Sequence, residues 1–227
     1  MNKIDFDIVI IGSGVIGHSI AFRLKQDAPH LKIAVLGDPV NSLQASRAAA
    51  GMLAPFCECD EADPFFKFCR ESLTKYPEFL KELASVSEVS VHHSFAGSLM
   101  PASSYRETWE ERKAFFARED IPHEVWSPEK VRQKAPYLAE DCGEVMWVGE
   151  GQVNNRQMHS ALIQASGRRG IHVLEANVSG FIRDGASILS AVTDSGNING
   201  ERFVLASGSW SSQLARVLEV SIPLKPI

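Results

Sequence analysis

The first 36 residues alternate short apolar runs with a glycine-rich turn and an amphipathic segment. Residues 7–11 read DIVII and residues 32–36 read KIAVL. Short runs rich in β-branched residues are typical of strands buried on both faces of a parallel sheet. Between the two runs, apolar residues recur at helical spacing over residues 15–25. The pattern therefore predicts a strand–helix–strand unit with a right-handed crossover.

The pattern changes twice in the rest of the chain. Residues 63–85 form a long amphipathic segment, in which Pro77 is expected to end one helix and begin another. Residues 89–148 mix strand-like runs with charged helical stretches, and a helix and short strands separated by glycine turns follow. The sequence therefore predicts an α/β protein. A parallel-sheet domain of residues 1–88 and 149–221 carries part of an inserted α+β domain of residues 89–148 and 222–227.

The turn after the first predicted strand carries the clearest candidate chemistry. Residues 12–17 read GSGVIG, which fits the pattern G-x-G-x-x-G. Gly12 permits a tight turn, Gly14 lets a pyrophosphate approach the backbone, and Gly17 lets the helix lie close to the sheet. The helix N-terminus offers its amides to the phosphates. We therefore predict a dinucleotide site that includes Gly12, Gly14, Val15, Ile16 and Gly17; a turn that only packs is the alternative.

The end of the second predicted strand departs from the usual dinucleotide pattern. An acidic residue about 20 positions after the last glycine ordinarily holds the ribose hydroxyls. Here that position is Gly37, and Asp38 follows it. Asp38 either takes the ribose role at a shifted position or is a turn residue before Pro39. No Arg or Lys stands at this strand end, so a 2′-phosphate is not favoured.

Composition and charge limit the classes of partner that this protein is expected to bind. The net charge is −5 and the sequence pI is about 5.8, so the charge gives no reason to expect nucleic acid or an anionic membrane. No apolar run approaches the roughly 18–20 residues that span a bilayer, and the first residues do not read as a signal peptide. We expect a cytoplasmic protein without a metal site, whose four cysteines are buried or half-buried thiols.

Five stretches together resemble one protein family. In chain order they read DIVIIGSGVIGHSIAFRL, SRAAAGMLAPFCECDEADPFFKF, EGQVNNRQMHSAL, FVLASGSWSSQLA and IPLKPI. They are similar to the glycine oxidase and D-amino-acid oxidase family of flavoproteins, especially its thiamine-pathway glycine oxidase branch. The resemblance implies a Rossmann-like FAD-binding domain and FAD, rather than NAD, as the cofactor.

The resemblance also implies roles for individual residues. Beside the turn glycines at the pyrophosphate and Asp38 at the ribose, it places further segments along the cofactor. These are Ser46 and Arg47 at the pyrophosphate and ribityl chain, Ala49, Ala50, Gly51 and Met52 beneath the flavin ring, Val178 at the adenine, and Ala206, Ser207 and Gly208 in a second glycine turn. Taken alone, Val178 also reads as an ordinary buried strand residue.

The reaction that the resemblance implies is oxidation of the C–N bond of a small amino acid or amine. A hydride passes from the substrate to flavin N5, the imine hydrolyses, and dioxygen or another acceptor reoxidises the flavin. This chemistry belongs mainly to the cofactor, so no catalytic side chain is assigned. A dinucleotide-binding module without catalysis remains the alternative. An NAD-dependent dehydrogenase is disfavoured by the SRAAAGML stretch and the inserted domain.

The chain stops at IPLKPI, where the resembled family continues into further strands. That part of the family supplies an arginine for the substrate carboxylate and a segment that closes over the flavin. We therefore expect a truncated member with weak or no turnover by itself, completed by an oligomer or by a separate C-terminal chain.

Overall fold

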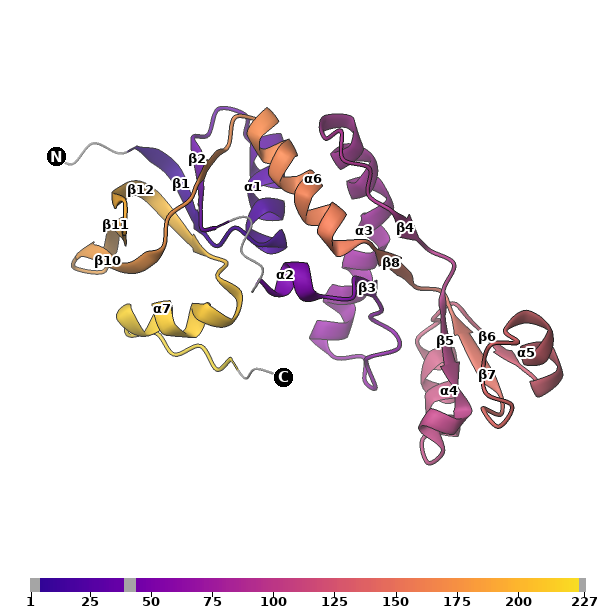
Figure 1. Cartoon of the computed structure of the whole chain (residues 1–227). Coiled ribbons are helices and arrows are strands. Elements are labelled where there is room, and N and C mark those ends of the chain that lie inside the picture. Colours follow the sequence, from indigo (N-terminus) through magenta and orange to yellow (C-terminus); the bar gives the residue numbers. More distant parts are fainter. Residues whose placement is uncertain (1–4, 39–43, 225–227) are drawn as a thin grey trace. The chain divides into compact units, whose positions relative to one another are not determined.

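The computed structural model describes residues 5–38 and 44–224. The chain, which Figure 1 colours from its N-terminus to its C-terminus, divides into two compact units. Unit 1 comprises Met1–Ala50, Glu82–Val91 and Asn155–Ile227, and unit 2 comprises Gly51–Lys81 and His92–Asn154. These limits differ from those predicted for the two domains, mainly because residues 51–81 belong to unit 2. The predicted functional domains stay a prediction, and residues 225–227 of the second one lie outside the described residues.

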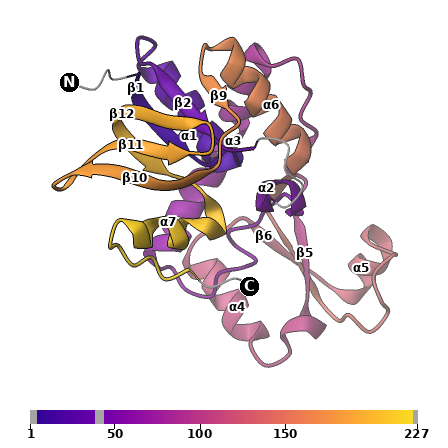
Figure 2. The same ribbon diagram turned by 60° about the vertical axis from the view of Figure 1, so that its left-hand side comes forward.

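Unit 1 is built on a six-stranded sheet in the order β10-β11-β12-β1-β2-β9. Strands β12, β1, β2 and β9 run parallel to one another. Strands β10, β11 and the first part of β12 form an antiparallel meander, labelled in Figure 2. The strands are β1 (Phe6–Ile11), β2 (Ile33–Leu36), β9 (His172–Leu174), β10 (Val178–Asp184), β11 (Ser187–Thr193) and β12 (Gly196–Leu205); the helices are α1 (Val15–Asp27), α2 (Ala45–Ala48), α6 (Asn155–Arg168), α7 (Ser211–Val217) and a 3-10 turn (Gly208–Trp210).

The central strands are buried on both faces, as their apolar runs predict. Ile10 of β1 packs toward Ala21 of α1, whereas its neighbours Val9 and Ile11 lie in a cluster with Leu214 of α7. Successive side chains of a strand point to opposite faces, so a continuous apolar run is buried only where both faces are covered. The sheet therefore holds β1 and the turn that follows it between packed layers.

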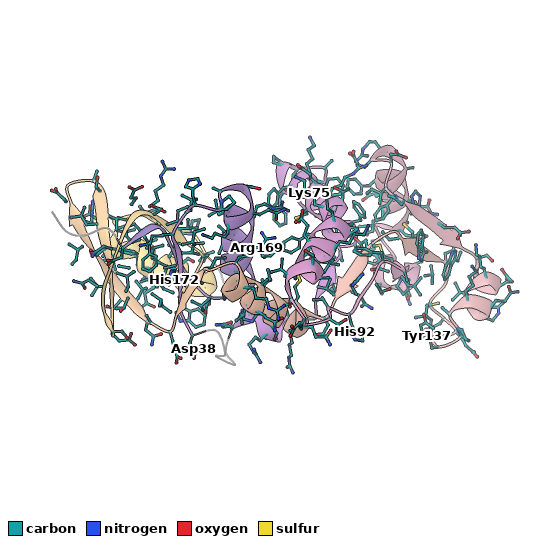
Figure 3. The ribbon with its side chains drawn as sticks, turned by 90° about the horizontal axis from the view of Figure 1, so that it is seen from above. Asp38, Lys75, His92, Tyr137, Arg169 and His172 are labelled. Carbon is teal, nitrogen blue, oxygen red and sulfur yellow. The ribbon has the colours of Figure 1, made fainter. Side chains whose placement is uncertain are left out.

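Helix α6 lies beside α1 on one side of this sheet, as Figures 1 and 2 both show. Arg169, just after α6 and labelled in Figure 3, lies with its guanidinium carbon 3.8 Å from the ring centre of Phe22 on α1. Helix α6 is the helix that the sequence predicts after residue 148, and Gly170 follows it at φ +71°. Residues near the start of α6 are thereby placed close to the glycine turn.

Unit 2 contains two small sheets, in the orders β3-β8-β4 and β5-β7-β6, both antiparallel. Its main core joins aromatic side chains of three helical or loop segments to Met146 and Val148 of β7. The strands are β3 (Met52–Leu53), β4 (His93–Ser94), β5 (Ser98–Pro101), β6 (His123–Trp126), β7 (Val145–Val148) and β8 (Gly151–Val153); the helices are α4 (Trp109–Arg118), α5 (Pro128–Lys134), a 3-10 turn (Ala102–Tyr105) and most of α3 (Pro64–Val86).

The predicted α/β class with a parallel sheet is confirmed, and one predicted break is wrong. Helix α3 continues through Pro77, although proline removes one backbone donor within a helix. The buried side chains of Phe66, Leu80 and Leu83 recur on both sides of Pro77, and Pro77 itself is exposed. Packing on both sides of the proline therefore outweighs the loss of one helical hydrogen bond.

Candidate functional site

The glycine turn follows β1 directly and needs glycine at its first position. The amide of Gly12 donates to the carbonyl of Leu36 over 2.8 Å, and Gly12 has a φ of +124°. A Cβ atom at this position would lie 2.2 Å from the carbonyl oxygen of Ala206. The backbone just after β12 therefore passes too close to Gly12 for any side chain, which is the tight approach that the pattern predicts.

The other two glycines set the start of α1. Gly14 is the N-cap residue and makes no side-chain capping bond. The next amide, of Val15, donates to Oγ of Ser46 over 2.9 Å, so a residue of α2 meets the first turn of α1. A Cβ at Gly17 would lie 1.9 Å from the carbonyl oxygen of Gly12. The helix thus begins directly beneath the turn, with the positive end of its dipole at the turn.

A groove of about 700 Å³, here called the glycine-turn groove, opens over this helix end. Its volume lies within the range of small-molecule and cofactor sites. No lysine or arginine is among the described residues that line it. The lining comprises Ile11, Gly12, Ser13, Gly14, Ile16, Leu36, Gly37, Asp38, Gln44, Ala45, Ser46, Ala176, Asn177, Val178, Ser179, Ala206, Ser207, Gly208, Ser209, Trp210, Gln213, Leu214 and Val217.

Many of the predicted cofactor residues come together in this groove, although they are far apart in sequence. Those on its lining are Gly12, Gly14, Ile16, Asp38, Ser46, Val178, Ala206, Ser207 and Gly208. Val15 and Gly17 lie in the first turn of α1, behind the lining. Arg47 is half-buried on α2, and its carbonyl accepts Nε–H of Arg156 over 3.2 Å. The cofactor roles of these residues stay predictions.

The predicted flavin-ring segment is not part of the groove lining, and the division of the chain into two units falls within this segment. Ala49 and Ala50 end a segment of unit 1, and both are exposed. Gly51, with a φ of +81°, and Met52 begin unit 2. Met52 is 61% exposed. The two alanines are therefore not packed into the protein interior, and their surface is open to contact with a ligand.

The end of β2 shows why the expected acid is displaced by one residue. Gly37 has a φ of +143°, and a Cβ there would lie 2.8 Å from Oγ of Ser13 and 3.0 Å from its amide nitrogen. The close approach of the glycine turn thus leaves no room for an acidic side chain at Gly37. Asp38, labelled in Figure 3, lines the groove instead.

Sequence reasoning missed several polar residues of the groove. Nε2 of Gln44 donates to Oγ of Ser13 over 3.3 Å and also to the carbonyl of Asp38. Asn177 and Trp210 line the groove beside predicted residues. Gln44 and Asn177 belong to no recognisable motif, so no sequence signal marks them. Trp210 stands two residues after Gly208, and its 49% exposure is unusual for a large aromatic side chain.

Unit 2 has a cavity of about 660 Å³, here called the acidic cavity. Two of its carboxylates are already used: Asp60 pairs with Arg112, and Oδ1 of Asp63 accepts the amide of Phe66 over 2.7 Å. The exposed side chains of Phe65 and Phe68 add apolar surface. The lining comprises Met52, Leu53, Ala54, Pro55, Glu58, Cys59, Asp60, Glu61, Asp63, Phe65, Phe68, Cys69, Ser72, Leu73 and Tyr76.

A buried carboxylate holds one wall of the acidic cavity. Glu150 is 1% exposed, and its Oε1 accepts the amides of Phe56 over 2.6 Å and Cys57 over 2.9 Å. Burial and the hydrogen bond to Glu150 raise the pKa of the Cys57 thiol. Glu150 therefore fixes the loop that continues along the cavity, and no motif in the sequence marks it.

The structure bears on the remaining expectations for the site. Cys57, Cys59 and Cys69 are half-buried free thiols and Cys142 is a buried one, as predicted. Within residues 5–38 and 44–224, no three His, Cys, Asp or Glu side chains gather in a way that would hold a metal ion. In the same residues, no helix combines the length and the apolar character needed to cross a membrane.

The residues of the glycine-turn groove fit the ADP half of a dinucleotide. The helix end and the turn offer backbone amides and a positive dipole to a diphosphate, which needs no basic side chain. Leu36, Val178 and Leu214 give the groove lining apolar surface, and Asp38 adds a carboxyl group to the same lining. An added Cβ at Gly208 would meet nothing within 4 Å, so the second glycine turn leaves space at the groove.

Comparison with protein families and curated proteins agrees with this geometry. The family profile described as "DAO: FAD dependent oxidoreductase" matches residues 7–227. The chain is 30% identical over 230 residues to the bifunctional protein ThiO/ThiG of Synechocystis sp., covering 97% of this chain and 32% of that protein. It is 26% identical over 227 residues to glycine oxidase of Bacillus subtilis, covering 99% of this chain and 60% of that enzyme.

Solved structures share the fold. Glycine oxidase from Geobacillus kaustophilus superposes with a TM-score of 0.88 at 24% identity, covering 96% of this chain and 59% of that one. Glycine oxidase from Bacillus cereus gives a TM-score of 0.82 at 25% identity, covering 93% and 58%. The chain thus spans about three-fifths of the length of the glycine oxidases that it matches.

Proposed function

Because this chain belongs to the family of FAD-dependent oxidoreductases, we propose that it binds FAD and serves in oxidising the C–N bond of a small amino acid or amine. The observation that carries the proposal is the glycine-turn groove. Nine of the residues predicted for the cofactor line it, and they come from five separate segments of the chain. The names of the similar glycine oxidases support the choice of substrate class.

Different parts of the groove are proposed to hold different parts of FAD. The glycine turn and the N-terminal end of α1 face the diphosphate, apart from the amides of Gly12 and Val15, which are bonded within the protein. Asp38 takes the ribose hydroxyls, and Val178 meets the adenine. Ala49, Ala50, Gly51 and Met52 are proposed to run beside the flavin ring. When bound, FAD supplies the acceptor for the hydride that leaves the substrate carbon. The protein contributes binding and orientation, and no side chain of this chain is required as an acid, base or nucleophile.

The acidic cavity supports a substrate that carries a positive charge. Glu58 and Glu61 stand on its lining, and no lysine or arginine does so among the described residues. We propose that this cavity attracts the ammonium group of the incoming substrate, which loses one proton to water before the hydride leaves the substrate carbon. Glycine and methylamine are expected to raise the melting temperature of the purified chain, whereas acetate is not. An equal effect of acetate would remove this assignment but would not touch the FAD site.

Full turnover is proposed to need more than these 227 residues. The similar glycine oxidases are longer, and about two-fifths of their length has no counterpart in the match. That remainder, on the same polypeptide or on another chain, is proposed to complete the substrate site. The 227-residue chain by itself is therefore expected to bind FAD but to turn over slowly or not at all.

Expression of the chain in a flavin-replete host tests the proposal. The purified protein is expected to be yellow and to release FAD on denaturation, and glycine is expected to yield little hydrogen peroxide. Fast peroxide production would contradict the need for the remainder. A colourless protein that also fails to bind added FAD would contradict the main proposal. A yellow protein whose flavin no amine bleaches, even with the missing part added, would favour a binding module without catalysis.

A further inference from the structure

Two fully buried histidines lie where α1 packs against α6. His18 on α1 and His159 on α6 are both 0% exposed, and their rings meet edge to face with centres 5.8 Å apart. Burial lowers the pKa of His18 to about 4, and burial also lowers the pKa of His159. Both rings are therefore neutral at physiological pH. Buried polar groups are nearly always hydrogen-bonded, so the partners of the two rings indicate their purpose.

The two rings have different partners. Nδ1 of His18 lies 2.9 Å from Oγ of Ser166, which is on α6 and fully buried. Nε2 of His159 lies 2.7 Å from the carbonyl oxygen of Ser13, in the glycine turn. A carbonyl only accepts, so Nε2 of His159 carries the proton and donates it. The other nitrogens, Nε2 of His18 and Nδ1 of His159, have no hydrogen-bond partner among the described residues.

The bond from His159 acts on one particular peptide unit. The carbonyl of Ser13 and the amide of Gly14 belong to the same planar trans peptide, so they point in opposite directions. The buried ring of His159 holds the carbonyl, and the amide of Gly14 therefore points away from α6. Gly14 is on the lining of the glycine-turn groove. Because Gly14 has no Cβ, this peptide would otherwise rotate at low cost.

We propose that His159 is a positioning residue for the cofactor diphosphate: its hydrogen bond to Ser13 keeps the Gly14 amide aimed into the glycine-turn groove. The inference rests on the proposed function, because the diphosphate belongs to the FAD placed in that groove. It adds a residue of α6, about 145 positions away in sequence, to the determinants of cofactor affinity. His159 touches neither substrate nor cofactor and acts only through the peptide that it holds.

Two substitutions of similar size separate this role from simple packing. In His159→Gln the side-chain amide can still donate to the Ser13 carbonyl, whereas in His159→Met it cannot. The affinity of the 227-residue chain for ADP and for adenosine is measured by calorimetry. His159→Met is expected to bind ADP roughly ten- to a hundredfold more weakly than His159→Gln. Both variants are expected to bind adenosine, which lacks the diphosphate, within about twofold of the unsubstituted chain. Equal ADP affinity in the two variants overturns the proposal, whether both are tight or both are weak.

A matched control removes the neighbouring ring instead. His18→Met alters the same buried interface but leaves the bond from His159 to Ser13 in place, so ADP affinity is expected to stay within about twofold. A tenfold loss in His18→Met would show that any change in this interface weakens the site, and the proposal would fail.

A measurement on the unsubstituted chain covers the case in which the variants do not fold. Nitrogen-15 NMR is expected to show the Nε2–H form of His159, and ADP but not adenosine is expected to shift the amide proton of Gly14. The Nδ1–H form, or a Gly14 amide that ADP leaves unmoved, overturns the proposal. If the unsubstituted chain binds neither FAD nor ADP, the proposed function falls together with the inference. If it binds both and the variants are equal, only the inference falls.

Discussion

The glycine-turn groove and the acidic cavity are built in different ways. The glycine-turn groove of unit 1 is shaped mainly by backbone, because Gly12, Gly14 and Gly37 each lie where a Cβ would meet a neighbour within 3 Å. The acidic cavity of unit 2 is shaped by side chains on a loop and one face of α3, and a single buried carboxylate, Glu150, holds the loop. The first is a site of amides and dipoles, and the second is a site of formal charges.

This difference decides how each cavity responds to substitution. A groove built in this way tolerates almost no added atom at its turn, since a Cβ at Gly12 or Gly17 would lie 2.2 Å or 1.9 Å from a main-chain carbonyl oxygen. A cavity built from side chains tolerates changes on its rim, and it is sensitive where a buried group satisfies backbone donors. The predictions below test whether the two units respond as differently as their construction implies.

The largest effect is expected for Gly12→Ala. The new Cβ would lie 2.2 Å from the Ala206 carbonyl oxygen, at a φ of +124°. Overpacking against main chain and the unfavourable φ together are expected to cost about 4 kcal/mol of unfolding free energy and to abolish FAD binding. Urea denaturation and flavin titration measure the two effects.

Gly196→Ala is the matched control for Gly12→Ala. Gly196 has a φ of +115°, but an added Cβ there meets nothing within 4 Å. This variant is expected to lose only about 1 kcal/mol and to keep its FAD affinity. Equal losses in the two variants would show that backbone strain, rather than the close approach of Ala206, sets the requirement at the glycine turn.

The next largest effect is a change of the unfolding free energy with pH, and it arises from buried histidines of unit 1. The pKa of His18 is lowered from 6.5 to about 4, first by burial and then by His159. Between these values the unfolded chain binds a proton that the folded chain does not, so stability rises with pH. The stabilisation is complete above pH 6.5 and is lost as the pH falls to 4, by about 3 kcal/mol. Burial lowers the pKa of His159, and the positive charge of Arg47 also acts to lower it. His159 therefore contributes to the pH dependence in the same direction.

Denaturation curves between pH 4 and 7.5 measure this slope. Carboxylates elsewhere titrate at the lower end of the same range, so the useful quantity is the difference between the unsubstituted chain and His18→Leu. The unfolding free energy of His18→Leu is expected to change less with pH than that of the unsubstituted chain. The difference is expected to be most of the 3 kcal/mol. Parallel curves for the two proteins would refute the assignment of the slope to the buried ring.

A smaller effect is expected in unit 2, for Glu150→Ala. The amides of Phe56 and Cys57 lose their acceptor in a buried position, which is expected to cost about 2 kcal/mol. Glu150→Gln keeps an oxygen for these amides and is expected to lose less than about 1 kcal/mol. Denaturation compares the two variants, and calorimetry with ADP is expected to find unchanged affinity in both. A weakened ADP site in Glu150→Ala would show that the two cavities are not independent.

The sequence predicts the backbone-built site far better than the side-chain-built one. The spacing of Gly12, Gly14 and Gly17 follows from a steric requirement, so the turn, the helix start and the groove could all be expected from it. Gln44 and Glu150 act through hydrogen bonds between segments far apart in sequence, and such partners leave no local pattern. His159 likewise reads as one more position on the buried face of a helix until its contact with Ser13 is seen.

The secondary-structure elements show the same contrast between features set by local sequence and features set by distant contacts. β1, β2 and α1 were predictable because buried periodicity and glycine punctuation agree there. The predicted helix break at Pro77 was wrong, because buried side chains on both sides of the proline stabilise α3 as one continuous helix. β12 begins at Gly196, well before the apolar run at residues 203–205. Its first residues are polar because they pair with β11 in a meander rather than lie in the buried parallel sheet.

A crystal structure of this chain grown with FAD tests the central claim most directly. The account predicts the diphosphate at the N-terminal end of α1, within hydrogen-bond distance of amides of residues 12–17, and the adenine beside Val178. FAD bound elsewhere on the chain, or a glycine-turn groove left empty at saturating FAD, would contradict it.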